Sequence, residues 1–376
     1  MVHSNDFSME RWSRQIILPE LGIAGQQRLL DAKVLCIGSG ALGSPATLYL
    51  AAAGVGHLVI VDPDVVESSN LQRQILHGES FRGRLKIESA ASRLLDLNPT
   101  LRLETHAVRF TPENALTLSE GCDVIVDGSD NFPTRFLTND TAFFRKIPLV
   151  HAAIQKFEGQ MTVFAPHRGG PCYRCLLPEL PAPGAVPSCA EAGVIGALPG
   201  IMGSMQAMET IKLITGIGEP AIGHMTCYDA LRNRFRQIAL APDPNCALCG
   251  KSPRLFHVSN PQTNAPTHCT MSTIPAISVN ELHELLTTSP GIRLIDVREP
   301  DEYAAAAISG SELVPLATIP EASQDWPKEQ RLYLHCKAGG RSARATQFLM
   351  DQGFADVINV TGGMDAWLAA GLPKKE

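Results

Sequence analysis

The first two thirds of the chain alternate between short apolar runs and longer helical patterns. The run "KVLCIG" at 33–38 leads through a glycine-rich turn into "PATLYLAAAG" at 45–54, and "HLVIVD" follows at 57–62. Further apolar runs stand in "CDVIVDGSDN", "IPLVHAAI" and "GQMTVFAP". Strand patterns interleaved with helical ones are typical of a mostly parallel sheet with helices on its faces. The pattern therefore predicts an α/β domain of this kind.

A change in composition and periodicity separates this region from the rest of the chain. Around 251–275 the sequence "KSPRLFHVSNPQTNAPTHCTMSTIP" is rich in Pro, Ser, Thr and Asn and has no sustained periodicity, which is typical of a linker. Helical and strand patterns then alternate again in "VNELHELL", "RLIDVR", "RLYLHC", "SARATQFLMDQG", "ADVINV" and "GGMDAWLAAG". We expect a first domain at 1–252, a linker at 253–273 and a smaller α/β domain at 274–376.

Composition excludes several function classes. A formal net charge of −6 gives no reason to expect binding to nucleic acid or to a membrane surface. The polar N-terminus lacks the apolar core of a signal peptide, and the most apolar stretch, 193–216, contains Glu209 and Lys212, which favours a buried helix over a membrane span. Ten cysteines, four of them in C-x-x-C pairs, suit a reducing compartment. We expect a cytoplasmic protein.

The glycine-rich turn is the first candidate for chemistry. Gly38, Gly40 and Gly43 form G-x-G-x-x-G between a strand and a helix, where backbone amides and the helix N-terminus favour phosphate. Asp62, at the end of the next strand, is placed to accept hydrogen bonds from ribose hydroxyls. These features alone are compatible with a nicotinamide dehydrogenase, or with a turn that serves packing only.

The segment that follows distinguishes between these possibilities. "SNLQRQILH" places Asn70, Arg73 and Gln74 behind the ribose acid, and Lys86 comes next. A triphosphate under attack needs fixed cations, whereas a dinucleotide pyrophosphate is held largely by backbone amides. Asp130 in "DGSDN" ends another strand and suits Mg²⁺. Each of the charged residues Arg73, Lys86 and Asp130, taken singly, is compatible with a solvated surface position. As an ordered set behind the glycine-rich turn, they favour ATP over NAD as the ligand.

Residues 10–250 resemble the MoeB/ThiF adenylyltransferases, relatives of the ubiquitin-activating E1 enzymes. The resemblance is carried by "RQIILPELGIAGQQRLL", "GSGALGSPATLYLAAAGVGHLVIVDPD", "SNLQRQILH" and "DGSDN". It implies a Rossmann-like E1-type adenylation domain, ATP and Mg²⁺ as cofactors, and a homodimer in which Arg14 reaches the active site of the other subunit. The nucleotide site it implies comprises Gly38, Gly40, Ala41, Gly43, Asp62, Asp64, Ser69, Asn70, Arg73, Gln74, Lys86, Asp130 and Asn131.

Two C-x-x-C pairs predict a metal site. Cys172 and Cys175 form one pair, and Cys246 and Cys249 form the other. Two such pairs supply the four ligands of one tetrahedral metal ion, and a closed Cys₄ shell of this kind is typical of structural zinc. A redox pair or buried free thiols are the alternatives. The MoeB/ThiF resemblance implies the same zinc.

Between the pairs, Cys189 lies in the Pro- and Gly-rich "PAPGAVPSCAEAGVIG". It is either an acyl-transfer cysteine, as in E1-type relatives, or an incidental residue.

The smaller domain has its own candidate nucleophile. Cys336 opens the loop "CKAGGRS" after an apolar strand, and Arg341 closes it. Loop amides and a following helix N-terminus stabilise a thiolate or a persulfide anion. Residues 274–373 resemble single-domain rhodaneses through "LIDVREPDEY", "CKAGGRS" and "NVTGGMDAW". The resemblance implies that Cys336 carries sulfur and that Arg341 and the loop amides hold the anion, while a buried structural cysteine is the alternative.

Together the two domains resemble the MoeB–rhodanese fusions of the MoeZ and Uba4-like type. The resemblance implies adenylation of the C-terminal glycine of a small ubiquitin-like sulfur carrier ending in Gly-Gly. Cys336, loaded by a cysteine desulfurase or thiosulfate, then supplies sulfur to give a thiocarboxylate, with Cys189 as a possible participant. An E1-like enzyme that forms a thioester at Cys189 is the alternative, and a decayed scaffold is disfavoured because both loops keep their key residues.

Overall fold

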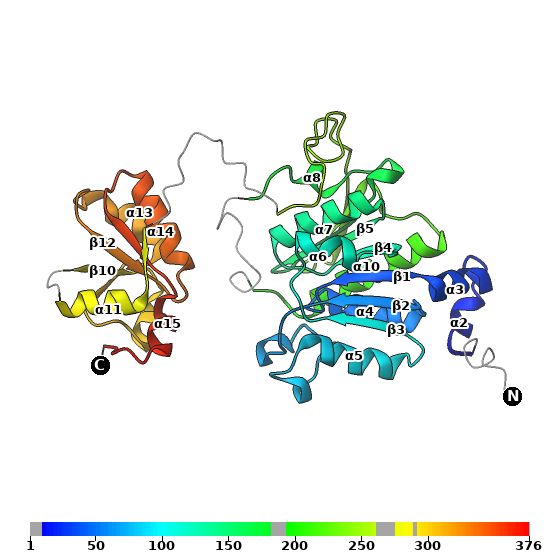
Figure 1. Cartoon of the computed structure of the whole chain (residues 1–376), viewed down its shortest axis with the longest axis horizontal. Coiled ribbons are helices and arrows are strands. Elements are labelled where there is room, and N and C mark those ends of the chain that lie inside the picture. Colours follow the sequence, from blue (N-terminus) through cyan, green and yellow to red (C-terminus); the bar gives the residue numbers. More distant parts are fainter. Residues whose placement is uncertain (1–9, 182–192, 261–274, 289–291, 376) are drawn as a thin grey trace. The chain divides into compact units, whose positions relative to one another are not determined.

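The chain folds into two compact units, one spanning Met1–Asn264 and the other Ala265–Glu376. The computed structural model describes residues 10–181, 193–260, 275–288 and 292–375, and Figure 1 shows both units in the colours of the sequence. Most of the predicted linker and Cys189 lie outside the described residues. The domain boundaries expected from the sequence therefore stay a prediction.

The larger unit is built on an eight-stranded sheet with the order β3-β2-β1-β4-β5-β6-β7-β8. The first five strands in that order are parallel, and β6, β7 and β8 continue the sheet in antiparallel fashion. The strands are β1 Lys33–Ile37, β2 His57–Val61, β3 Arg102–His106, β4 Val124–Asp127, β5 Leu149–Gln155, β6 Glu158–Phe164, β7 His224–Asp229 and β8 Arg234–Ala239.

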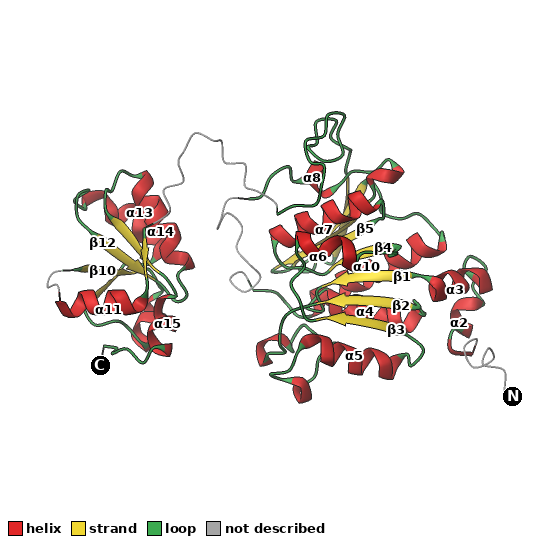
Figure 2. Ribbon diagram, in the orientation of Figure 1, coloured by secondary structure: helices red, strands yellow, loops and turns green. Residues whose placement is uncertain are grey.

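Helices cover both faces of this sheet, because successive side chains of a strand point to opposite faces. Val34 and Cys36 of β1 belong to a core cluster with α3, α4, α5 and α10, whereas Leu35 and Ile37 belong to a second cluster with α6 and α7 (Figure 2). The helices are α2 Ser13–Ile16, α3 Gly22–Asp31, α4 Gly43–Ala53, α5 Lys86–Leu97, α6 Pro112–Leu118, α7 Phe132–Arg145, α8 Tyr173–Leu176 and α10 Ala197–Thr215.

The helix α10 confirms the interpretation of the apolar stretch at 193–216. Its residues Leu198, Met202 and Ala207 are buried, and Glu209 pairs with Lys212 at 2.5 Å. In the described part of the chain no helix is long and apolar enough to cross a membrane.

The smaller unit contains a five-stranded parallel sheet with the order β11-β10-β12-β13-β9. Two core clusters flank the sheet, one under α14 and one between α11 and α15. The elements are β9 Ala276–Ile277, α11 Val279–Thr288, β10 Arg293–Asp296, α12 Pro300–Ala305, β11 Ser311–Leu313, α13 Ile319–Ala322, β12 Leu332–His335, α14 Gly340–Asp351, β13 Val357–Val360 and α15 Gly363–Ala369.

Candidate functional site

The glycine-rich turn lies at the carboxyl edge of the parallel strands, between β1 and α4. Gly38 has φ +86°, and a side chain there would meet the backbone of Gly128, in the turn after β4, at 3.0 Å. A Cβ on Gly43 would stand 2.0 Å from the Gly38 carbonyl oxygen, whereas at Gly40 the nearest atom is the Gln74 side chain at 3.6 Å. The turn therefore depends on Gly38 and Gly43, and Gly40 leaves its backbone open.

A pair of alanine substitutions tests this difference. We expect Gly43→Ala to lower the free energy of unfolding by about 1–3 kcal/mol, because the new methyl group overlaps backbone that cannot retreat. Gly40→Ala is the matched control and meets only a flexible side chain. Chemical denaturation of the full chain measures both changes, and equal losses at the two positions would contradict this view of the turn.

Acidic and polar side chains hold the turn from the neighbouring elements. Asp62 accepts hydrogen bonds from the Ser39 amide at 2.8 Å and the Ser39 hydroxyl at 2.9 Å. The buried His77 contacts the Ser39 carbonyl oxygen at 2.9 Å, and burial lowers the pKa of its imidazole. The Gln74 amide lies over Gly40 and is buried. The structure thus brings together the turn, the predicted ribose acid and the predicted polar segment.

Lys86 is a buried cation at the same edge. It begins α5, its side chain is 7% exposed, and its Nζ donates to the Asp64 carboxylate at 2.9 Å. Its backbone amide also donates to the Asp64 carbonyl oxygen at 2.9 Å. A buried lysine with one exposed carboxylate partner is rare without a role or a compensating ligand. Lys86 therefore places a fixed ammonium group beside the turn, paired in this structure with the exposed Asp64 carboxylate.

The segment around η1 (Ser68–Asn70) carries the other predicted phosphate ligands. Asn70 is buried and accepts the Glu67 amide through its side chain at 3.1 Å, so it caps this turn. Arg73 is partly exposed and donates to the Ser69 carbonyl oxygen at 2.8 Å, and Ser69 itself is exposed. Ala41 is partly buried in the glycine-rich turn. These contacts fix the segment locally.

Asp130 follows β4 and is exposed. Asn131 donates to it at 3.3 Å and caps α7 by accepting the Thr134 amide at 2.9 Å. Because β1 and β4 are adjacent and parallel, with Ile37 opposite Asp127, the loops after both strands lie at one edge of the sheet. An exposed carboxylate at this edge fits the oxygen ligand that Mg²⁺ prefers.

A buried Asp127–His151 pair supports this loop, and no motif in the sequence predicts it. Asp127 is fully buried; it accepts His151 Nδ1 at 2.7 Å and the Ser129 hydroxyl at 2.6 Å. Burial by itself would raise the pKa of Asp127, but the hydrogen bond and charge of His151, the charge of Arg135 and the Ser129 hydrogen bond together outweigh burial, so the pKa lies below the usual value. The strand-end position of Asp127 was the available signal; its partner on β5 became visible only in the fold.

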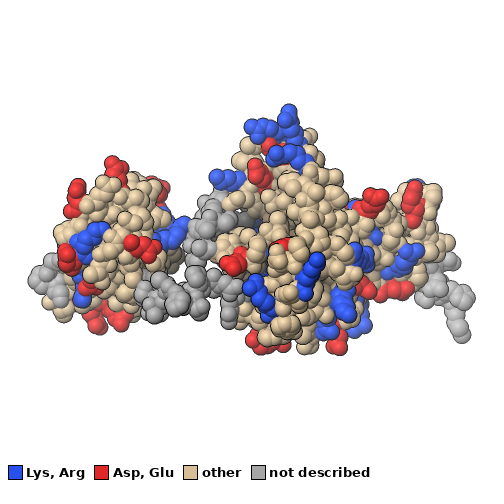
Figure 3. Space-filling view, turned by 90° about the horizontal axis from the view of Figure 1, so that it is seen from above, with Lys and Arg blue, Asp and Glu red and all other residues tan. Residues whose placement is uncertain are grey.

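Arg14 lies in α2 and is exposed. The structure contains one chain, so the role implied for Arg14 stays a prediction. On the face drawn in Figure 3, acidic and basic side chains are interspersed over both units, apart from one small group of basic side chains on a projection of the larger unit.

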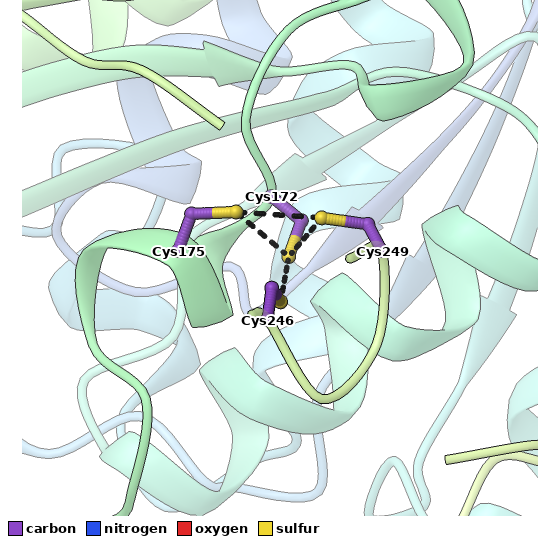
Figure 4. A group of neighbouring side chains, drawn as sticks. All are labelled: Cys172, Cys175, Cys246 and Cys249. Carbon is purple, nitrogen blue, oxygen red and sulfur yellow. Dashed lines mark hydrogen bonds between the residues drawn. The ribbon is translucent and has the colours of Figure 1, made fainter. Parts of the chain in front are cut away.

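The four cysteines of the C-x-x-C pairs converge on one point (Figure 4). Their sulfur atoms all lie within 4.8 Å of one another, with Cys172 to Cys246 at 3.6 Å and Cys175 to Cys249 at 3.3 Å. A tetrahedral ion with Zn–S bonds of about 2.3 Å requires sulfur separations of roughly 3.8 Å, so the shell fits. Hydrogen bonding from Cys172 lowers the pKa of Cys175 to about 6. The cluster is a candidate metal centre.

Backbone geometry builds this cluster from two distant segments. Cys172 caps α8, which carries Cys175, while a turn after β8 carries the other pair. A Cβ on Gly250 would lie 2.5 Å from the Cys246 carbonyl oxygen, so that turn requires glycine. Next to the cluster, Arg174 and Asp140 form a buried bidentate pair, with both bonds at 2.8 Å. The cluster thus brings the turn after β8, which carries Cys246 and Cys249, next to the segment that carries Cys172 and Cys175.

Cys336 lies at the carboxyl end of β12, where the loop wraps onto the N-terminus of α14. The residue is 1% exposed; the Gly339 amide donates to its sulfur at 3.1 Å and the Ser342 hydroxyl lies at 3.5 Å. The Met364 amide donates to the Cys336 carbonyl oxygen at 2.8 Å, and a Cβ on Gly363 would overlap that oxygen. The loop thus aims neutral donors at one sulfur atom.

Arg341 forms a bidentate pair with Glu302 instead of bonding to the sulfur. Its two terminal nitrogens donate to the Glu302 carboxylate at 2.6 and 2.7 Å. These hydrogen bonds lower the pKa of Glu302 to about 2. The partner of Arg341 lies 39 residues away in the sequence, and no local signal predicts such a contact.

Asp296 and Arg298 form a buried structural ion pair. Both residues are buried, and their charged groups meet at 2.5 Å. Arg298 also donates to the carbonyl oxygens of Glu302 and Ala306, so it fixes α12 to the end of β10.

The two units thus define an E1-like adenylation fold with a possible metal shell and a cysteine-loop fold of the rhodanese type. The ThiF family model matches residues 12–248, and the rhodanese-like domain model matches residues 278–370. A crystal structure of E. coli MccB shares the fold of the larger unit, with a TM-score of 0.57 and 21% identity over 64% of this chain and 74% of that chain.

Curated relatives match nearly the whole chain. The probable adenylyltransferase/sulfurtransferase MoeZ of Mycobacterium tuberculosis is 42% identical over 95% of this chain and 92% of its own length. The adenylyltransferase and sulfurtransferase MOCS3 of Sus scrofa is 39% identical over 96% of this chain and 85% of its own length. The SAMP-activating enzyme E1 of Haloferax volcanii is 50% identical over 65% of this chain and 89% of its own length.

The chain belongs to the ThiF family, in the group that also carries a C-terminal rhodanese-like domain. The resemblance drawn from the sequence is confirmed, and so is the expected fold class. Relatives in this group are adenylyltransferase and sulfurtransferase enzymes, and the chain is an enzyme of this kind.

Proposed function

We propose that the chain activates the C-terminal glycine of a ubiquitin-like sulfur carrier with ATP and then delivers sulfur to it from Cys336. The observation that carries the proposal is the Cys336 loop, in which an amide and a hydroxyl converge on one sulfur atom, in a chain that also holds a ThiF domain. A carrier ending in Gly-Gly presents the carboxylate that the adenylation unit would take.

Adenylation would use the edge of the larger sheet. The carrier carboxylate attacks the α-phosphate, the bond to the β-phosphate breaks, and pyrophosphate leaves. The turn at Gly38–Gly43 would present its amides to the phosphates, Asp62 would hold the ribose, and Lys86 and Arg73 would offset the developing charge. The remaining polar residues of the predicted site, Asp64, Ser69, Asn70, Gln74 and Asn131, would line the same edge.

Magnesium would bind at Asp130. The exposed carboxylate at the end of β4 is the oxygen donor expected for this ion. When bound, Mg²⁺ would supply charge neutralisation on the phosphates. In a homodimer Arg14 would add a cation from the neighbouring subunit.

Sulfur transfer would use Cys336 as a persulfide. Its terminal sulfur attacks the acyl-adenylate carbonyl and AMP leaves, which joins carrier and enzyme through an acyl disulfide. A thiol then attacks the Cys336 sulfur, a new disulfide forms, and the carrier leaves as a thiocarboxylate. Either Cys189 or an external thiol reductant would provide that thiol. A second thiol, from an external thiol reductant, would then cleave this disulfide and free the Cys336 thiolate, which a cysteine desulfurase or thiosulfate would reload. A cytoplasmic location would supply both donor and reductant.

Zinc is the metal proposed for the cysteine cluster, because a closed shell of four thiolates suits a structural ion. We expect Cys172→Ser to cost about 3 kcal/mol or more, since metal binding contributes to folding. For a unit of this size that corresponds to a fall in thermal midpoint of roughly 6–12 °C. Calorimetry with elemental analysis measures both effects.

The matched control for this substitution is Cys227→Ser, at a partly buried cysteine of β7 outside the cluster. The control should keep its zinc and its thermal midpoint. If the Cys172→Ser variant bound one zinc per chain with an unchanged midpoint, Cys172 would not be a ligand of a structural zinc, and the four-cysteine site would be wrong.

Isotope exchange tests the adenylation step. The intact protein with a candidate carrier and Mg²⁺ should exchange labelled pyrophosphate into ATP, and a carrier that lacks its terminal glycine should support none. Exchange that needs no carrier would contradict the proposal.

An E1-like function without sulfur transfer is the second candidate, favoured by the similarity of the larger unit to the SAMP-activating enzyme E1. It requires a carrier thioester at Cys189 that forms without Cys336. A hydroxylamine-sensitive conjugate on Cys189 in a Cys336→Ala background would support it.

A further inference from the structure

We propose that Glu302 determines which class of sulfur donor loads Cys336, favouring thiol persulfides over sulfonate-bearing donors such as thiosulfate. The inference rests on the proposed sulfur-carrying role of Cys336. It concerns the selection of the donor by a residue outside the cysteine loop.

The contact that carries the proposal is the Glu302–Arg341 pair. Arg341 is the cation that closes the cysteine loop, in the first turn of α14, and Glu302 comes from the first turn of α12. Both nitrogen–oxygen contacts are short, and the side chains are 25% and 27% exposed. A bidentate pair of this kind is stronger than a single contact and is specific in direction. The loop's guanidinium is therefore committed to a carboxylate.

Glu302 is held in place by contacts of its own. Its carboxylate accepts the Glu299 amide at 3.1 Å in a capping box. Its carbonyl oxygen accepts Arg298, which is bound to the buried Asp296. The carboxylate is thus an anchored partner of Arg341, not a flexible surface charge that a ligand displaces without cost.

The hydrogen-bond donors described at the Cys336 sulfur are uncharged. The Gly339 amide and the Ser342 hydroxyl suffice for a thiolate or a terminal persulfide, each with one negative charge. Thiosulfate carries two negative charges and a sulfonate group that needs a cation. It would have to compete with Glu302 for Arg341, and the exposed Glu299 adds a second negative charge on the flank of Arg341. The surroundings therefore disfavour the dianion.

Both loading reactions are balanced without an outside oxidant or reductant. With thiosulfate, the Cys336 thiolate attacks the sulfane sulfur, the S–S bond breaks, and sulfite leaves with the electron pair. With a thiol persulfide the same attack expels a thiolate. The two donors differ in the charge and shape of the leaving group, which is where Arg341 would act.

The test compares loading rates in the full-length protein with Glu302→Gln. Glutamine keeps the capping box and the side-chain shape but removes the charge. Thiosulfate and glutathione persulfide are each mixed with the protein, and the persulfide on Cys336 is followed by alkylation and mass spectrometry. We expect the ratio of the second-order rate constants, thiosulfate over glutathione persulfide, to rise by about tenfold or more.

Two further variants distinguish an effect of the Glu302–Arg341 ion pair from a general effect of nearby negative charge. Glu302→Gln combined with Arg341→Gln should lose the gain, because the freed guanidinium is what binds the sulfonate. Glu299→Gln, which removes a charge from the same flank, should change the ratio by less than about threefold.

The outcomes distinguish this inference from the proposed function. If neither donor forms a persulfide on Cys336 in the unmodified protein, the sulfur-transfer proposal fails. If persulfide forms but the ratio stays constant in Glu302→Gln, or rises equally in Glu299→Gln, the assignment to Glu302 is overturned while the function stands.

Discussion

Cys336→Ala is expected to abolish sulfur loading of the chain while carrier-dependent pyrophosphate exchange continues at its normal rate. Within the described loop, the Cys336 sulfur is the only atom that both the Gly339 amide and the Ser342 hydroxyl contact. Its removal leaves no acceptor for the sulfane sulfur. The residues proposed for adenylation belong to the other compact unit. Alkylation with mass spectrometry measures loading, and isotope exchange measures adenylation.

Alanine at 336 removes one buried sulfur from a core cluster, so the fold of the variant must be verified. Circular dichroism and the thermal midpoint provide this control. A well-folded Cys336→Ala protein that still accumulated persulfide would show that another cysteine carries the sulfur. A folded variant that lost both activities would contradict the division into two sites.

Asp130→Ala is expected to reduce carrier-dependent pyrophosphate exchange by about 100-fold or more, the size of effect seen when one group that stabilises transition-state charge is lost. Asp130 is exposed and makes one long contact with Asn131, so its removal costs little stability. Persulfide loading of Cys336 should be unchanged. Exchange is measured over a range of Mg²⁺ concentrations.

Asp96→Ala is the matched control for this experiment. Asp96 lies in α5 and is likewise an exposed carboxylate, with only a 3.7 Å contact to Arg93. The control should exchange pyrophosphate normally. If Asp130→Ala and Asp96→Ala behaved alike, Asp130 would have no part in adenylation.

Much of the fold could be predicted because its strands are buried on both faces and read as continuous apolar runs. β1, β2, β4 and β5 were visible for this reason. β8 was not, since all six of its residues are exposed and the strand contains Arg234, Arg236 and Gln237. Neither was the antiparallel end of the sheet, because hydrophobic patterns do not record strand direction. Such strands depend on pairing with a neighbour, which only the assembled sheet shows.

The cysteine cluster was predicted most completely. Paired cysteine spacing encodes a local turn that presents two sulfur atoms, so the ligand set follows from the sequence once two pairs are present. The position of Cys336 at a strand end followed equally from the apolar run before it. Both features are local, and local geometry is what a sequence pattern expresses.

Contacts between distant segments were the part that the sequence could not supply. The Asp127–His151 pair joins two strands, and Glu302 reaches Arg341 from another helix. The rhodanese resemblance implied that Arg341 holds the anion at the sulfur, and the structure shows its guanidinium bound to Glu302 instead. The partner of a long charged side chain depends on tertiary packing, so only the fold reveals which carboxylate lies within reach.

The most direct measurement is mass spectrometry of candidate Gly-Gly-ending carriers after incubation with the full-length protein, ATP, Mg²⁺, a persulfide donor and a thiol reductant. We expect one carrier to gain the mass difference of an oxygen-to-sulfur exchange at its C-terminal carboxylate. This gain should require both Asp130 and Cys336. A carrier that was adenylated but never gained sulfur, or that gained it equally with Cys336→Ala, would contradict the claim that the two units catalyse successive steps of one reaction.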